Sequence, residues 1–313
     1  MFATIALLAA LVAAPQPAPA QTGSTPVVDR AVEVTHGVPA EQVKEDKLDL
    51  IEHISDSHEI ATPWGAIHLP PAGSWQVGPV DMTPTRHVVF LGLAGIIVLL
   101  LIIPAAQSAK RTGHGTPRKG HNVIESLILF FRDQVVMPTI GHGGERYVPY
   151  IITLFFFIVV ANLMGLLPWG VTPTANVSVT GALAILSLIV IEISGMIALG
   201  PMGYLKTIVY IPHGLPKFMI PIMVPIMIPV EVLGKLAKPF ALAIRLFANM
   251  TAGHVVLLVL IGLIFVFGSF VIAVGPVLMA VALSFLEIFV AFLQAYIFAL
   301  LTAVFIGLIR HAH

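Results

Sequence analysis

A permanently charged arginine lies inside one of the longest apolar stretches of this chain. Arg245 belongs to the segment from Phe240 to His254, which also contains Asn249. An arginine near the centre of a bilayer costs roughly 2.5–3.5 kcal/mol on insertion scales, and its guanidinium keeps its proton in proteins. We therefore expect Arg245 to act on charges that move through a membrane. The alternative is a static ion pair with an acid of the same chain.

Composition predicts a multi-pass membrane protein. Of the 313 residues, 58% are hydrophobic and only 10% are charged, and the mean hydropathy is +0.97, which is typical of membrane proteins and not of soluble domains. Because there is no cysteine, disulfides and thiolate metal sites are excluded. No G-x-x-x-x-G-K-[ST] loop occurs, which argues against a subunit that itself hydrolyses ATP. We expect no cofactor, no metal and no nucleic-acid partner.

Acidic residues are unevenly distributed along the chain. Thirteen of the sixteen lie before residue 147, and the others are Glu192, Glu231 and Glu287. Each of these three lies in or beside an apolar run. Because carboxylates inside a membrane are costly, they mark functional sites by default. Together with Arg245 and His254, they indicate a path for protons or other cations.

The first 85 residues differ from the rest of the chain. Residues 1–20 resemble a cleavable signal, with a short apolar core followed by small residues; an uncleaved Ala/Pro-rich terminus is the alternative. Residues 21–85 are polar and rich in acids, which predicts a leader outside the membrane, and residues 86–313 are predicted to form the membrane domain. Four leader histidines have no metal-ligand spacing, and we interpret them as solvated: His36, His53, His58 and His68.

The hydropathy pattern predicts five membrane-crossing helices. The first three are Val88–Ile103, Tyr147–Leu167 and Val177–Leu199. By the positive-inside rule, the basic loop after the first of these lies in the cytoplasm, as does the C-terminus, and the leader lies outside. The basic residues of this loop are Lys110, Arg111, Arg118 and Lys119.

Residues 121–137 are too polar to cross a membrane but have the pattern of an amphipathic helix. Polar side chains including Glu125 and Arg132 fall on one helical face, and apolar side chains including Val123 and Phe131 fall on the other. This pattern is typical of a helix that lies in the cytoplasmic interface. A docking surface for a partner helix is the alternative interpretation.

The fourth apolar segment, residues 218–268, is too long for a straight crossing. At 1.5 Å per residue it would extend roughly 75 Å, whereas the hydrocarbon core is about 30 Å thick. We expect it to bend, tilt strongly or begin in the interface, with break points at its prolines. After Gly268 and Gly275-Pro276, residues 277–310 are predicted to form the last helix. The prolines are Pro221, Pro225, Pro229 and Pro239.

The last two helices are predicted to form an antiparallel hairpin that turns near residue 270. Residues at equal depth in such a hairpin have numbers that add up to about 540. This relation places Arg245 level with Gln294, and it places His254 level with Glu287. Arg245 and His254 are nine residues apart and therefore point in opposite directions. We interpret His254 and Glu287 as a proton relay reached from outside, with Arg245 facing something else.

The other two acids of the apolar region each have two interpretations. Glu231 precedes Arg245 by fourteen residues, which places it nearer the cytoplasm, where it could line a second path. It also lies four residues before Lys235, so an interfacial ion pair is the alternative. Glu192 lies late in the third span. A buried protonated carboxyl group that makes a helix–helix contact is at least as well supported there as a transport role.

Several motifs together resemble one known family. Arg245-Leu-Phe-Ala-Asn249-Met-Thr-Ala-Gly-His254, followed by Gln294-Ala-Tyr-Ile-Phe, resembles subunit a of the F-type ATP synthase membrane sector. The resemblance covers about residues 86–310 and is highly specific in its combination of motifs. Further matching motifs are Asn162-Leu-Met-Gly-Leu-Leu-Pro168, Pro173-Thr-Ala-Asn176 and Pro229-Val-Glu231.

The resemblance implies an all-α subunit of the bacterial inner membrane that lies against a rotating ring of c subunits. It implies two aqueous half-channels that reach the ring from opposite sides, peripheral-stalk b subunits as further partners, and no enzymatic activity of the chain on its own. Arg245 is expected to displace the proton from each ring carboxylate and to block direct leakage. Further proton-path candidates are His254, Glu287, Gln294, Asn249, Glu231, Asn162 and Asn176, with Glu192 in addition.

The chain departs from many bacterial members of this family at two positions. Those members carry Glu where this chain has His254, and His where it has Glu287. Both arrangements put one carboxylate and one imidazole at the same depth, which explains why the exchange is workable. The signal-like start and the long acidic leader are not general family features.

A self-contained secondary transporter or antiporter is the alternative function. Such a protein would favour inverted repeats and a midplane site built within one chain. No repeat is evident, and Arg245 has no acid on its own face at its own depth. These residues leave the choice between H⁺ and Na⁺, and the number of ring subunits, undetermined.

Overall fold

A computed structural model of the chain describes residues 59–62, 65–71, 74, 76–77, 80–81, 83–111, 121–167, 170–208, 220–267 and 270–311. The expected signal at residues 1–20 and most of the predicted leader lie outside these ranges. The described part of the leader contains two short antiparallel hairpins, which the hydropathy pattern did not indicate. They pair β1 (Glu59–Thr62) with β2 (Gly65–His68), and β3 (Gln76–Val77) with β4 (Val80–Asp81).

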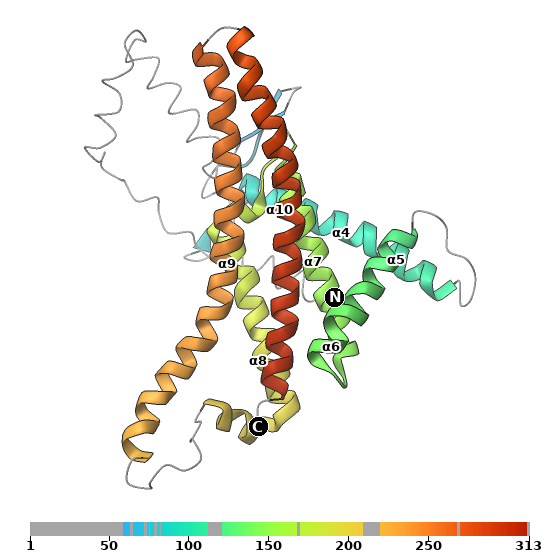
Figure 1. The fold of residues 1–313 in the computed structure, drawn as a ribbon, viewed down its shortest axis with the longest axis vertical. Helices are drawn as coiled ribbons and strands as arrows, with labels where there is room; N and C mark the ends of the chain where they lie inside the picture. The colour runs from blue at the N-terminus through green and yellow to red at the C-terminus, as the bar shows by residue number, and fades with distance from the viewer. Residues whose placement is uncertain are drawn as a thin grey trace.

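Five of the described helices are long and apolar enough to cross a membrane. This confirms the predicted all-α polytopic membrane protein, whose helices are shown in Figure 1. The five are α4 (Arg86–Arg111), α7 (Val148–Met164), α8 (Val177–Ile208), α9 (Ile220–Phe267) and α10 (Phe270–Arg310). Two short 3₁₀ helices, η2 (Gly144–Tyr147) and η3 (Pro173–Ala175), precede α7 and α8.

α7 is the buried helix of the bundle because it is apolar on every face. Nearly all of its residues from Ile151 to Met164 are buried. A helix that is hydrophobic all round is stable only when other helices or lipid surround it, and α7 contacts both α4 and α10. α10, which carries Glu287 and Gln294, therefore packs against an apolar support.

The third crossing helix is interrupted at Gly200, next to its predicted end. Gly200 has a φ of +71°, a conformation that favours glycine. Pro201 follows at the first position of the next helical turn, where its missing N–H costs least. The straight part of α8 therefore ends at Leu199 as predicted, and residues 201–208 continue in a new direction.

α9 and α10 contact each other and form the predicted antiparallel hairpin (Figure 1). α9 has 48 residues and remains helical through Pro225, Pro229 and Pro239. It nevertheless curves away from α10 toward its N-terminal end (Figure 1), in agreement with the bend expected for this proline-rich part. α10 has 41 residues, so both helices are longer than a straight crossing requires.

The predicted start of the last helix is wrong, because α10 begins at Phe270 and not at residue 277. The prediction treated Gly275-Pro276 as part of the turn, whereas both residues lie inside α10. Pro276 removes one backbone hydrogen bond near the helix start. An unwound segment in lipid would leave more backbone groups unpaired, which favours continuing the helix. The chain passes from α9 to α10 through residues 268–269, outside the described ranges.

The predicted amphipathic segment is helical but contains a π-helical turn. It consists of α5 (His121–Phe130), η1 (Phe131–Val136) and α6 (Met137–Ile140). The predicted apolar face is not buried along its whole length. Phe131 and Val135 are fully buried in a segment that contacts α7 and α10, whereas Val123 is 65% exposed.

Candidate ion-conducting site

Arg245 lies exposed on α9 beside apolar side chains. Leu246 and Met250 of the same helix are buried and anchor the inner face of α9 in the core. Phe240 and Ile244 are exposed, as Arg245 is. Within the described ranges, Arg245 forms no ion pair and no side-chain hydrogen bond. The described part of the chain therefore contains no acid that serves as its static partner.

His254 of α9 and Glu287 of α10 face each other across the hairpin. His254 Nδ1 lies 3.5 Å from Glu287 Oε1, and the Glu287 side chain is only 7% exposed. This confirms that the two residues lie at the same depth, as the numbering relation predicted. Glu287 Oε2 and the Thr251 hydroxyl are buried and have no hydrogen-bond partner among the described residues. Such atoms keep hydrogen-bonding capacity for a proton or a water molecule.

Gln294 and Arg245 have different environments, although they were predicted to lie at the same depth in the hairpin. Gln294 is buried, as is Glu287 seven residues before it on the same face of α10, whereas Arg245 is exposed. No hydrogen bond joins Gln294 to Arg245 in the part of the chain that the structure describes. Asn249, one turn after Arg245, is partly buried. The roles of these residues in ion transfer stay predictions.

Asn162 lies in a fully hydrogen-bonded junction of α7, α10 and η3. Its Nδ2 donates to the backbone carbonyl of Ala291 at 3.3 Å, and its Oδ1 accepts from the Thr174 hydroxyl at 2.5 Å. Asn176 caps the start of α8, where its Oδ1 accepts from the backbone N–H of Ser178 at 2.9 Å. Asn162 thus joins α7 to α10 and η3, Asn176 caps its own helix, and the place of both residues along a proton path stays a prediction.

Glu192 of α8 forms an ion pair with Lys235 of α9. Lys235 Nζ lies 3.6 Å from Glu192 Oε2 and donates to the Thr207 hydroxyl at 3.3 Å. It also lies 4.6 Å from the centre of the Tyr204 ring, and the Tyr204 hydroxyl donates to the same Glu192 oxygen. The helix–helix contact expected of Glu192 is therefore present, but with a lysine as its partner.

The alternative ion pair between Glu231 and Lys235 does not form. Although the two residues are one turn apart on α9, Lys235 is directed to Glu192, and Glu231 has no ion partner in the described ranges. Tyr204 and Thr207 are members of the Glu192 cluster that pattern analysis missed. Tyr204 reaches Glu192 and Thr207 reaches Lys235 because the chain turns at Gly200, and the Gly-Pro pair there is the signal that could have indicated it.

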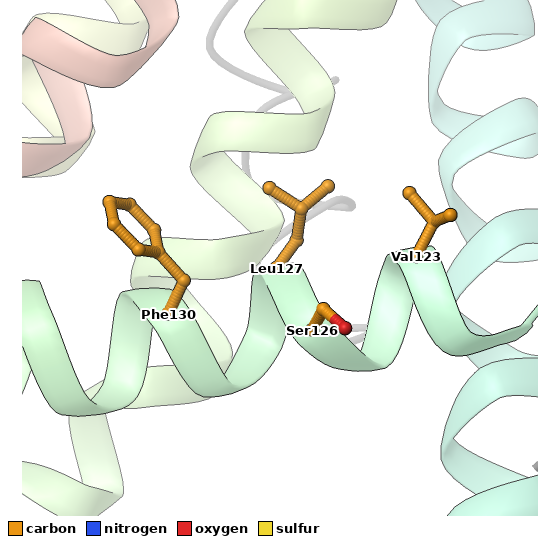
Figure 2. A pocket seen from close by; sticks show the side chains of 4 residues that line it. All are labelled: Val123, Ser126, Leu127 and Phe130. Atoms are coloured by element: carbon orange, nitrogen blue, oxygen red, sulfur yellow. The ribbon is translucent and has the colours of Figure 1, made fainter.

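An apolar groove lies along α5, on the side of α4 rather than on the exposed face of α9. It has a volume of about 410 Å³ and is lined by Val123, Ser126, Leu127 and Phe130. Figure 2 shows Val123, Leu127 and Phe130 projecting from the same side of α5. α4 contacts α5, and the Phe130 ring lies 6.3 Å from the ring of Tyr296 in α10. This groove is a second apolar surface, separate from the surroundings of Arg245.

The fold and these residues define a multi-pass α-helical membrane protein with charged side chains inside its membrane-crossing helices. Such residues mark ion pathways in membrane proteins. No three His, Asp or Glu side chains gather in the described ranges in a way that could hold a metal ion. The profile of the family described as ATP synthase A chain matches residues 88–307. The chain belongs to the ATP synthase A chain family.

Curated relatives of this chain carry the name ATP synthase subunit a. A protein of Chloroherpeton thalassium is 45% identical over 266 residues, which cover 84% of this chain and 77% of the relative. A protein of Chlorobaculum tepidum, named ATP synthase subunit a 2, is 40% identical over 306 residues, covering 91% and 84%. A protein of Myxococcus xanthus is 44% identical over 234 residues, covering 74% of each chain.

Part of the leader is shared with one of these relatives. The alignment with the Chlorobaculum tepidum protein covers 91% of this chain, which is more than the family profile over residues 88–307 can account for. The similarity to this relative therefore extends into the residues before 88, which the family profile does not match.

Proposed function

We propose that this chain is the stationary proton-channel subunit of a rotary F-type ATP synthase, which couples proton translocation to ATP synthesis and makes no bonds itself. The observation that carries the proposal is the exposure of Arg245 on an apolar helix without an ion partner in the described ranges. Because a permanent cation in apolar surroundings is costly, it favours an anion that is brought to it. A carboxylate on a neighbouring subunit meets this requirement.

The surface proposed to meet the c-subunit ring is the exposed apolar face of α9 and α10. Lipid would cover its apolar side chains equally well, but lipid chains would leave Arg245 without an anion. A protein partner with membrane carboxylates would cover the apolar side chains and also supply an anion to Arg245. Exposed large side chains of this face include Phe240 and Ile244 on α9 and Phe285, Leu286 and Phe289 on α10.

Arg245 would release the proton from each ring carboxylate that reaches it. A nearby positive charge in surroundings of low dielectric stabilises the ionised form of a carboxyl group. The same fixed charge opposes the passage of a proton directly from one half-channel to the other. A lysine would serve poorly, because it lacks the planar fork of the guanidinium and loses its charge more readily when desolvated.

His254 and Glu287 are proposed to line the half-channel that opens outside, and Glu231 the half-channel that opens to the cytoplasm. The support is the 3.5 Å approach of His254 to Glu287 and the lack of an ion partner for Glu231 in the described part of the chain. A carboxylate without a fixed cation can take up and release a proton. The remaining proposed path residues are Gln294, Asn249, Asn162 and Asn176.

The lengths of α9 and α10 support a strongly tilted hairpin. At 1.5 Å per residue the two helices extend roughly 72 and 62 Å, about twice the hydrocarbon thickness. Figure 1 shows α4 running at a steep angle to both. We infer that α4 lies closer to the membrane normal, with the leader outside and the C-terminus in the cytoplasm. Tilt would let the hairpin follow the surface of a ring.

The groove on α5 is proposed to receive the membrane helix of a peripheral-stalk b subunit. It lies on α5 beside α4, whose outer face also carries exposed apolar side chains, so a helix placed there would leave the α9–α10 face free for the ring. The exposed residues of α4 include Leu93, Ile96 and Leu100.

The test of the proposed function is Arg245→Ala in the complete complex. We expect coupled ATP synthesis to be lost while the complex still assembles, with passive proton leakage as a further readout. Arg146→Ala, at an exposed arginine of η2, is the control and should retain synthesis. Recovery of coupled synthesis when Arg245→Ala is combined with Glu231→Gln or Glu287→Gln would show a static ion pair and would overturn the proposal.

A further inference from the structure

The Glu192–Lys235 pair lies one helical turn from the acid proposed for the cytoplasmic half-channel. Glu231 and Lys235 are separated by four residues of α9, a spacing at which opposite charges ordinarily pair. The side chain of a helical residue leans toward the helix N-terminus, so Lys235 leans toward Glu231. In the absence of another anion, Lys235 would bind Glu231.

Three groups of α8 hold Lys235 instead. The Glu192 carboxylate supplies the opposite charge at 3.6 Å, the Thr207 hydroxyl accepts a hydrogen bond at 3.3 Å, and the ring face of Tyr204 lies 4.6 Å away. Side chains of Glu192 and Lys235 are only 19% and 15% exposed. Because the pair is largely shielded from water, the attraction between its two charges is screened less than in a surface salt bridge.

The turn at Gly200 makes this arrangement possible. Residues before the turn supply Glu192, and residues after it supply Tyr204 and Thr207. A straight α8 would carry Tyr204 three turns away from Glu192, beyond the reach of its hydroxyl. The hydrogen bond from Tyr204 to Glu192 therefore orients the carboxylate toward α9 through the tertiary fold alone.

We propose that Glu192 is a positioning residue of the cytoplasmic half-channel, which diverts Lys235 from Glu231 and thereby keeps the Glu231 carboxylate free to exchange protons. This inference rests on the proposed function, because it assigns Glu231 to the proton path. Glu192 itself is not assigned to the proton path in this proposal. Its carboxylate neutralises the lysine that would otherwise hold Glu231 in a static ion pair.

Among the residues that the structure describes, the other cations at this end of the helices are engaged or exposed. Lys238 lies over the ring of Phe305 in α10 at 5.1 Å. Arg310 donates to the backbone carbonyl of His142 and lies over the Tyr147 ring. Lys206 is exposed. Of these described cations, Lys235 is the one that lies a single turn from Glu231 on the same helix.

The test measures ATP synthesis driven by an imposed proton gradient in vesicles that contain the complete complex, together with the yield of assembled complex. Glu192→Gln should lower the synthesis rate roughly tenfold at unchanged yield, because the freed Lys235 binds Glu231. Glu192→Asp should retain most of the rate. The double variant Glu192→Gln with Lys235→Gln should regain most of it, because the competing cation is gone. Lys206→Gln is the matched control and should behave as the parent.

The double variant distinguishes a positioning role of Glu192 from a purely structural role, in which the Glu192–Lys235 pair only holds α8 against α9. A purely structural role predicts that removing the second partner does not restore synthesis. A rate that stays low in the double variant would therefore overturn the inference. Loss of assembly in Glu192→Gln that Lys235→Gln does not repair would overturn it as well. Glu231→Gln is measured in parallel. A parental rate there would remove Glu231 from the path and the inference with it, whereas a low rate with an unaffected Glu192→Gln would refute the inference alone.

Discussion

Gly253 of α9 lies directly against the carboxyl group of Glu287 in α10. A Cβ atom built on Gly253 would lie 3.0 Å from Glu287 Oε1 and 3.1 Å from its Cδ. The missing side chain lets the carboxyl group rest on α9 one residue before His254, whose Nδ1 lies 3.5 Å from the same oxygen. The contact between the two helices at this level therefore depends on three residues.

Gly253→Ala should lower proton-driven ATP synthesis roughly fivefold, because the added methyl group displaces the Glu287 carboxyl by a few tenths of an ångström in a site that depends on position. Gly262→Ala is the matched control in the same helix, since nothing lies within 4 Å of its Cβ position. Equal rates in the two variants would contradict a positional role for Gly253.

His254 and Glu287 should act as one unit in proton transfer. The single changes His254→Ala and Glu287→Ala should each reduce passive proton flux through the membrane sector, and the double change should cost far less than the sum of both. The exchange of His254→Glu with Glu287→His should retain more flux than either half alone. Independent and additive losses would mean that the two residues do not share a path.

Gly307 of α10 permits the close approach of α6. A Cβ on Gly307 would overlap the backbone carbonyl oxygen of Thr139, and a backbone group cannot move aside as a flexible side chain does. Gly307→Ala should therefore destabilise the protein by about 1–3 kcal/mol, seen as a lower melting temperature in detergent. Gly275→Ala, which meets open space in the same helix, should leave the melting temperature close to that of the parent.

Val123→Glu tests the groove on α5. A charge in this apolar groove should weaken the docking of the proposed peripheral-stalk helix, because the carboxylate would lose its hydration there. The measurement is the amount of b subunit that is purified with the chain. Leu129→Glu is the control, since Leu129 is also exposed on α5 but does not line the groove. An equal amount of b subunit in both variants would place the stalk elsewhere.

Single cysteines at Ser57 and Ser108 should react from opposite sides of the membrane. Ser57 belongs to the predicted leader and lies outside the described residues, and Ser108 lies near the end of α4. The positive-inside rule places the first outside and the second in the cytoplasm. Labelling of both by an impermeant reagent from one side would reverse or abolish the proposed orientation.

Hydropathy and helical spacing were sufficient to predict the features that depend on the bilayer or on the packing of one pair of helices. Five apolar runs predicted five crossing helices, because a backbone in lipid has to satisfy its hydrogen bonds internally. The equal depth of His254 and Glu287 in the hairpin followed from the position of its turn. The start of α10 did not follow, because turn residues such as Gly275 and Pro276 tolerate a helical conformation when lipid disfavours a break.

By itself the sequence determined that five apolar helices form and that His254 lies level with Glu287, because these features depend on local hydropathy and on a fixed rise per residue. Only the tertiary structure decided which side chains meet. Lys235 lies one helical turn from Glu231, but the packing of α8 against α9 pairs it with Glu192 instead. Likewise, on the predicted apolar face of residues 121–137, the fold buries Phe131 and leaves Val123 exposed. Such choices depend on how distant helices pack, which no local pattern contains.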